Sequence, residues 1–262
     1  MCLRFLGEFV FVALLCWPAH AGEQPFAVCA DPENLPYSSR DKGGFELEAA
    51  RLLAEDVGRK LEIVWVAQRT PDFLRATILA GKCNAVMSVP SAFKSLATTD
   101  PWYRSSFTFV TRQDRLANLR DFDDPRLRQL RVGVAVAARG IGTPPSIALL
   151  KRGISENVRS YSLLDSSTLI DDLSVGTLDV AIAWGPFAGW YAHEAALKQE
   201  APTLLSISPI AAADHEIPLV FEISIGLKKS DFELRKELDL AIDRNRSSIQ
   251  AILDRWHIPR AR

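Results

Sequence analysis

The sequence predicts an α/β fold of two similar lobes, each a doubly wound, mostly parallel sheet. In each of two stretches a helix ends at a glycine, a short apolar strand follows, and a proline ends the strand. The first stretch runs from Gly81 to Pro90 and the second from Gly176 to Pro186, about 95 positions further on. Unbroken apolar runs of this length are typical of strands buried on both faces of a parallel sheet. Two such lobes facing each other would enclose a cleft.

The first lobe is predicted to follow the order strand, helix, strand, helix, strand. Its strands are expected at Phe26–Ala30, Leu61–Trp65 and 84–89. Apolar residues recur on one face of a helix that begins after Gly44 and is ended by Gly58. A second helix is expected from 71 to 80, because Pro71 is suited to a first helical position.

The second lobe repeats this pattern. Its strands are expected at 131–136, 158–161 and 180–183, with helices beginning at Pro144 and Pro186 and another at 169–175. Alternating strands at 107–111 and Val220–Leu227 are predicted to cross between the lobes. A helical region over 232–256 returns to the first lobe.

We therefore expect the first lobe to contain residues 22–111 and 222–262, and the second lobe residues 112–221. The predicted hinges lie between Thr111 and Arg112, and between Phe221 and Glu222.

Composition and charge are ordinary for a soluble globular protein. Hydrophobic residues make up 48%, charged residues 24%, and the net charge is -1. This balance gives no electrostatic footprint for nucleic acid or for an anionic membrane. The apolar start with its single Arg4, followed by Ala19-His20-Ala21, predicts a secretory signal peptide over residues 1–21 and therefore a periplasmic protein. No later segment is long and apolar enough to span a membrane.

Signal cleavage would leave Cys29 and Cys83, an even pair in an oxidising compartment. Both lie in or beside strands that are predicted neighbours, but Cys29 comes late in its strand and Cys83 at the start of its own. A disulfide and two buried free thiols both remain open. Neither cysteine has a histidine partner in the sequence pattern, and the histidines are scattered, so neither a catalytic thiol nor a metal site is expected.

Candidate ligand contacts lie mainly at the carboxyl ends of strands, where open α/β sheets bind ligands. They are Asp31, Asn34, Tyr37, Arg69, Ser91, Tyr103, Thr143, Trp184 and Gly185. Trp184 is either the floor of a cleft or a core plug. The loop after the first strand can hold a polar ligand or can be a capped surface loop. The helix that follows Thr143 can bind an anion at its free N-terminus or can be capped without a ligand.

The segments Gly44-Phe45-Glu46-Leu47-Glu48 and Asp100-Pro101-Trp102-Tyr103 resemble motifs of the type II periplasmic solute-binding proteins, family 3. That resemblance implies the fold. Amino-acid binders of the family clamp the ligand carboxylate with an Arg and the ammonium with an Asp. Here Ala92 and Trp184 stand near those positions, so the resemblance does not imply a free amino acid as ligand.

A narrower resemblance covers essentially the whole mature chain. Segments 28–38, 68–69, 98–105, 152–159 and 184–191 are together similar to the MxaJ/XoxJ family, periplasmic proteins encoded beside quinoprotein methanol dehydrogenases. The resemblance implies a binding-type fold dedicated to such a dehydrogenase system. Separately, we expect a monomeric, non-enzymatic protein without a cofactor. Its implied partner is a PQQ-dependent alcohol or methanol dehydrogenase or its cytochrome, with this chain as accessory protein, activator or carrier of a small ligand in the cleft.

Two other functions are weighed against this one. The first is a receptor of an ABC transporter that closes over a small organic solute by hinge motion. The second is an enzyme, since some relatives of the fold are cyclohexadienyl dehydratases or lytic transglycosylase modules. The sequence shows no nucleophile–base pair, metal cluster or cofactor loop, so no enzyme is expected.

Overall fold

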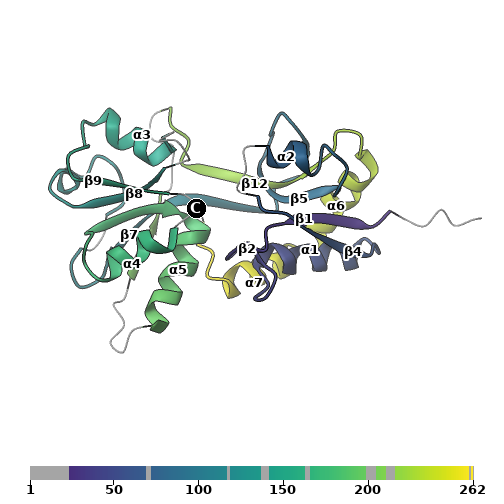
Figure 1. Cartoon of the computed structure of the whole chain (residues 1–262), viewed down its shortest axis with the longest axis horizontal. Helices are drawn as coiled ribbons and strands as arrows, with labels where there is room; N and C mark the ends of the chain where they lie inside the picture. The colour runs from purple at the N-terminus through teal and green to yellow at the C-terminus, as the bar shows by residue number, and fades with distance from the viewer. Residues whose placement is uncertain are drawn as a thin grey trace, which may run out of the picture.

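A computed structural model describes residues 24–68, 72–116, 119–136, 142–162, 166–198, 205–210, 216–259 and 261. The predicted signal peptide and the candidate Arg69 lie outside these residues. The elements gather into two lobes, which are joined in the middle by the strands β7 (Tyr103–Arg112) and β12 (Val220–Leu227) (Figure 1). The predicted two-lobed α/β fold is confirmed.

The first lobe has the predicted strand–helix order. Its parallel strands β1 (Phe26–Ala30), β4 (Leu61–Trp65) and β5 (Ala85–Pro90) lie in the order β4-β1-β5. Helix α1 (Phe45–Asp56) follows β1, after the short strands β2 (Glu33–Asn34) and β3 (Ser38–Ser39).

Helix α2 (Phe73–Ala76) is much shorter than the predicted 71–80. The Thr77 hydroxyl donates a hydrogen bond to the Phe73 carbonyl at 2.6 Å, and the Thr77 backbone is not helical. Such a bond to the preceding turn competes with helical hydrogen bonding, so the chain continues to Gly81 as turns.

The second lobe places its parallel strands in the order β10-β8-β9. These strands are β8 (Val132–Val136), β9 (Val158–Ser162) and β10 (Val180–Trp184). Its helices are α3 (Pro144–Lys151), α4 (Ser166–Ser174) and α5 (Gly185–Lys198), with a 3-10 turn, η1 (Pro125–Arg128), ahead of β8.

Strand β7 begins at Tyr103, four residues before the predicted 107–111, because its first residues pair with β12. From Phe107 onward it pairs instead with β10 and with β11 (Leu205–Pro209). Strand β12 in turn pairs antiparallel with β5 and with β6 (Ala97–Thr98), so a single sheet runs through both lobes. The residue limits expected for the lobes stay a prediction.

The predicted helical region 232–256 is two helices, α6 (Phe232–Arg244) and α7 (Arg246–Arg255). They meet at Asn245, whose side-chain amide donates to the Ala241 carbonyl at 2.9 Å and to the Asp56 carboxylate at 2.8 Å. Asn is well suited to a helix end because its amide can satisfy exposed backbone groups. Both helices pack their apolar faces on α1, as part of the first-lobe core.

The first-lobe core does not stop at the lobe boundary. Trp184, Phe187 and Trp190, at the end of β10 and on α5, pack against it although they belong to second-lobe elements. The facing surfaces of the two lobes are therefore in direct apolar contact, and that contact positions the candidate site.

Candidate functional site

Trp184 ends β10 and packs among aromatic residues of the crossing strands. Its ring centroid lies 5.2 Å from that of Phe107 on β7 and 5.7 Å from that of Phe221 on β12, both in edge-to-face geometry. Trp184 itself is half-buried. Of the two roles that the sequence left open for Trp184, this geometry resembles a plug between the lobes more than an empty cleft floor.

Tyr37 is the first-lobe residue that contacts the second lobe here. Its ring lies 5.0 Å from the Phe45 ring on α1 and 5.2 Å from the Phe187 ring, which belongs to the first turn of α5. Only 8% of Tyr37 is exposed. Phe187, which the sequence interpretation did not select, thus covers a residue that it did.

A chain of polar side chains runs from this contact into the first lobe. The Trp184 indole and the Tyr103 hydroxyl are polar neighbours of the Tyr37 hydroxyl and affect its pKa. Tyr103 and Ser88 have their hydroxyl oxygens 3.3 Å apart, and Ser88 is a polar neighbour of the Glu46 carboxyl group. These side chains form a row of polar groups that runs from Trp184 to Glu46 within the buried contact.

Burial changes the ionisation of these groups. It raises the pKa of the Glu46 carboxyl from 4.5 to about 7, against the opposing effect of the hydrogen bond from Ser88. It also raises the pKa values of Tyr37 and Tyr103 well above their usual range. A carboxyl group whose pKa lies near 7 can switch between hydrogen-bond acceptor and donor around neutral pH. Such shifted pKa values are common at functional sites.

A cavity of about 250 Å³ opens beside Glu46 at the carboxyl ends of β4 and β5. Its polar lining comes from Glu46, Gln68 and Ser88, and its apolar lining includes Phe73 and Phe93. Glu46 belongs to the segment that carried the family resemblance. It lies at the start of α1, and its side chain lines the cavity together with Ser88 of β5. Sequence analysis missed Glu46 and Ser88 as site residues because only the folded sheet brings them together.

Two candidate ligand contacts, Asp31 and Asn34, make hydrogen bonds that stabilise the loop after β1. The Asp31 carboxylate accepts backbone hydrogen bonds from Glu33 at 2.9 Å and from Gln68 at 2.8 Å, so it ties this loop to the end of β4. Asn34 lies in the hairpin of β2 and β3, where its carbonyl accepts from the Tyr37 amide at 2.9 Å. These contacts fix the position of Tyr37.

Three other candidates lie apart from the Glu46 cavity. The Ser91 hydroxyl lies 2.7 Å from the Ser224 hydroxyl, and Thr143 donates to the Ala135 carbonyl at 2.6 Å. The Thr143 hydroxyl is therefore engaged with the backbone rather than capping α3. Gly185 begins α5, where a Cβ would lie 2.7 Å from the Ser105 hydroxyl, so close packing requires glycine.

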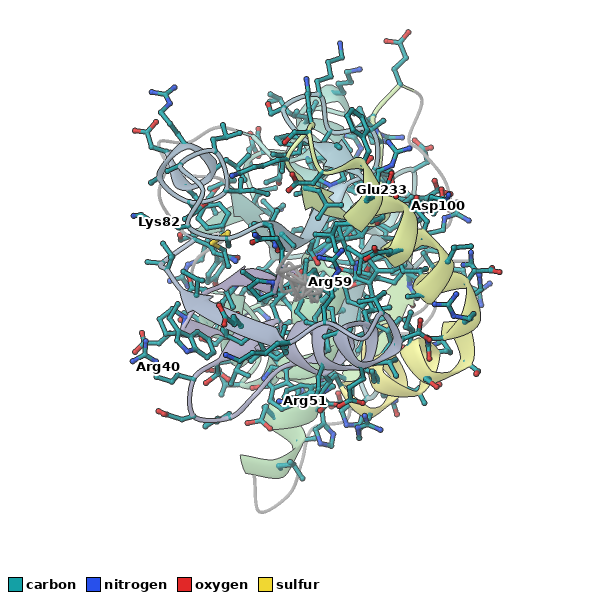
Figure 2. All side chains as sticks on the ribbon, turned by 90° about the vertical axis from the view of Figure 1, so that its right-hand side faces the viewer. Arg40, Arg51, Arg59, Lys82, Asp100 and Glu233 are labelled. Atoms are coloured by element: carbon teal, nitrogen blue, oxygen red, sulfur yellow. A yellow bond between two sulfur atoms is a disulfide. The ribbon has the colours of Figure 1, made fainter. Side chains whose placement is uncertain are left out.

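Cys29 and Cys83 form a disulfide, with their Cα atoms 5.6 Å apart (Figure 2). Parallel pairing of β1 with β5 brings the two together: Val28 is the partner of Ala85. The bond lies in the apolar cluster that also contains Phe73 and Phe93, which border the Glu46 cavity.

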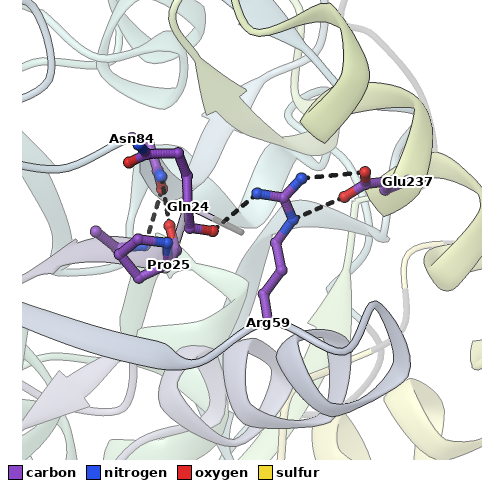
Figure 3. A network of polar contacts seen from close by, with 6 residues as sticks. Gln24, Pro25, Arg59, Asn84 and Glu237 are labelled. Atoms are coloured by element: carbon purple, nitrogen blue, oxygen red, sulfur yellow. Dashed lines mark hydrogen bonds and ion pairs between the residues drawn. The ribbon is translucent and has the colours of Figure 1, made fainter. Parts of the chain in front are cut away.

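A larger cavity of about 620 Å³ lies at the outer end of the first lobe, the end that faces the viewer in Figure 2. Arg59 lies there and bonds to both carboxylate oxygens of Glu237 and to the Gln24 carbonyl (Figure 3). This network joins the start of β1 to α6. These contacts connect parts of the first lobe to one another. We therefore place the candidate site at the lobe interface instead.

In the described part of the chain, no group of three or more His, Cys, Asp or Glu side chains is arranged to hold a metal ion. The helices described there include none with the length and apolar character needed to cross a membrane.

Comparisons with known proteins agree with the geometry. The sequence profile of the bacterial extracellular solute-binding proteins, family 3, matches residues 26–259. Protein MoxJ of Methylorubrum extorquens is 27% identical over 282 residues, which cover 95% of this chain and 90% of MoxJ.

Two solved structures are similar over nearly their whole length. The periplasmic binding protein XoxJ from Methylobacterium extorquens AM1 is 30% identical, with a TM-score of 0.73, and covers 90% of this chain and 99% of its own. MxaJ from Methylophaga aminisulfidivorans MPT is 26% identical, with a TM-score of 0.76, and covers 89% and 99%. This chain belongs to the bacterial extracellular solute-binding proteins of family 3 and, within them, to the MxaJ/XoxJ group.

Proposed function

We propose that the protein is a non-enzymatic, monomeric periplasmic protein that assists a PQQ-dependent methanol or alcohol dehydrogenase, by binding the dehydrogenase or its cytochrome. The observation that carries the proposal is the contact of Phe187 and Trp184 with Tyr37. Among the described residues, these side chains bring the two lobes into contact near the carboxyl ends of β1 and β10, where a receptor of this fold would bind a solute.

Similarity to MoxJ, MxaJ and XoxJ supports the choice of partner, through the dehydrogenase systems that the resemblance implies. The solute-binding family and its binding-protein relatives support a role without catalysis. The predicted signal peptide supports the periplasmic location.

Association in solution tests the proposal. The mature protein is mixed with the dehydrogenase and, separately, with the cytochrome of the same organism, and each mixture is followed by sedimentation velocity. We expect one of the two to give a faster-sedimenting complex. If neither does at concentrations of tens of micromolar, the partner role is wrong.

The cavity beside Glu46 favours a second function, binding of a small organic solute, as a carrier or as a transport receptor. About 250 Å³ lined by one carboxyl group, one amide and one hydroxyl suits a compact, uncharged, hydrogen-bonding molecule better than a free amino acid. A thermal-shift screen tests this. A ligand at 100 times its dissociation constant would stabilise the protein by about 2.7 kcal/mol. If no compound raises the melting temperature, only the partner role remains.

A further inference from the structure

Two histidines from opposite lobes stack on each other at the edge of the lobe interface. The ring centroids of His193, on α5, and His257, just after α7, lie 3.7 Å apart with an interplanar angle of 25°. Stacked neutral imidazoles attract each other as other aromatic pairs do. Two imidazolium ions at the same separation repel each other, because they bring like charges together.

The backbone around the pair is fitted closely. A Cβ on Gly189 of α5 would lie 1.8 Å from the His257 carbonyl oxygen, so this approach is open to glycine alone. His257 has a φ of 55°, in the left-handed region that a non-glycine residue adopts at a cost. One turn along, the Trp190 ring lies 4.9 Å from the Trp256 ring. The segment 256–259 is thus held against α5 by a small, specific set of contacts.

We propose that the stack of His193 and His257 is a pH-dependent latch, which holds α5 against the segment 256–259 and is released when both imidazoles are protonated. Helix α5 carries Phe187 in its first turn, and Phe187 covers Tyr37. Release of the latch therefore loosens the cover over the polar chain that leads to Glu46. This inference does not depend on the identity of a partner or ligand.

Of the other charged groups near the pair, Glu48 and Asp254 have hydrogen-bond partners of their own, and Glu194 is the next residue in the chain after His193. Glu48 of α1 accepts from the Trp256 indole at 2.9 Å and pairs with Arg255. Asp254 accepts from the Gln250 amide at 2.9 Å, and its backbone carbonyl accepts from the His257 amide. Partial desolvation by the groups packed against it, and then the charge of His193, lower the pKa of His257, and no carboxylate among the described residues opposes them.

The direction of the pH effect follows from that lowering. A histidine with a lowered pKa binds fewer protons in the latched state than in the released state. The latch is therefore strongest at pH values above the pKa of a free imidazole, about 6.5, and weakens as the pH falls below it. His257 is exposed to solvent, so its proton exchanges freely.

The test is a pH titration of the whole mature protein by NMR. Imidazole carbon–proton signals report protonation of His193 and His257, and the indole N–H signals of Trp190 and Trp256 report the contact beside them. In the wild type we expect the indole signals to move together between pH 7.5 and 5, with the protonation of His257, at a midpoint below 6.5. Static indole signals over this range would overturn the proposal.

Two variants separate the latch from general acid effects. His193→Phe keeps a stacking ring but cannot be charged, so we expect the indole transition to disappear and the midpoint of His257 to move up towards 6.5. His257→Asn tolerates a positive φ but removes the stack, so we expect released-state indole signals already at pH 7.5. If His193→Phe keeps the wild-type transition and midpoint, the latch is wrong. If His193→Phe does not fold, His193→Gln with released-state signals at pH 7.5 supports the latch, and latched signals contradict it.

Discussion

The Tyr37 ring lies 5.2 Å from the Phe187 ring, edge to face, so the loop after β1 and the first turn of α5 meet across the two lobes. The Trp184 indole is a polar neighbour of the same Tyr37 hydroxyl. One tyrosine therefore receives both an apolar and a polar contact from the second lobe, and this shared contact is the basis of the first prediction.

Phe187→Ala should uncover Tyr37 and lower the free energy of unfolding by about 2 kcal/mol, since it removes a partly buried aromatic ring and one aromatic pair. Urea denaturation measures the stability, and spectrophotometric titration of tyrosine measures whether Tyr37 becomes easier to ionise. Phe232→Ala is the matched control, because Phe232 is 67% exposed and should change stability little. Equal effects of the two variants would contradict the assigned contact.

Glu46 should make the protein less stable as the pH rises. Burial raises the pKa of Glu46 from 4.5 to about 7, so the folded state binds more protons than the unfolded state between these values. The free energy of unfolding is then expected to fall by about 3 kcal/mol between pH 4.5 and 7.5 on account of this group.

Glu46→Gln should remove that decline, while Glu62→Gln, at an exposed position of β4, should leave it in place. Urea denaturation of the three proteins at pH 5 and pH 8 measures the difference. A wild-type decline that survives in Glu46→Gln would show that another group causes it.

The disulfide should contribute strongly to stability because it closes a long loop. Cys29 and Cys83 are 54 positions apart, and on the chain-entropy model a loop of this size corresponds to about 4 kcal/mol. The double variant Cys29→Ala with Cys83→Ala should unfold at a correspondingly lower guanidinium concentration. A reductant should have no effect on the double variant, and a loss below about 1 kcal/mol would contradict the expectation.

Ser105 and Ser224 should respond in opposite ways to removal of their hydroxyls. The Ser105 hydroxyl is buried without a hydrogen-bond partner among the described residues, whereas that of Ser224 bonds to Ser91. Ser105→Ala should leave stability unchanged or raise it by up to about 1 kcal/mol, and Ser224→Ala should lower it by about 1 kcal/mol. Denaturant midpoints measure both, and a large loss in Ser105→Ala would reveal a missed partner.

Sequence patterns predicted the strands well because a parallel sheet buries them on both faces. The apolar runs and the glycines that precede them were sufficient to place β5 and β10. The break at Asn245 was missed because the apolar seam continues across it on both helices.

The site was predicted only in part. Tyr37, Tyr103 and Trp184 lie together in the candidate site, but Glu46, Ser88 and Phe187 join them only through folding, from α1, β5 and α5. Thr143 is the opposite case, a predicted site residue that lies apart from the Glu46 cavity. Its place before Pro144 suited a helix cap, yet its hydroxyl is bound to the Ala135 carbonyl, a partner that no local pattern reveals.

The rate of the PQQ-dependent dehydrogenase of the same organism is the first measurement to make, because it shows whether this protein assists a quinoprotein dehydrogenase. Its physiological cytochrome is the electron acceptor, and increasing amounts of the mature protein are added. We expect the rate to rise and saturate with added protein, and not to rise with heat-denatured protein. A rate that stays constant up to a large molar excess would contradict it and would favour the solute-binding role of the Glu46 cavity.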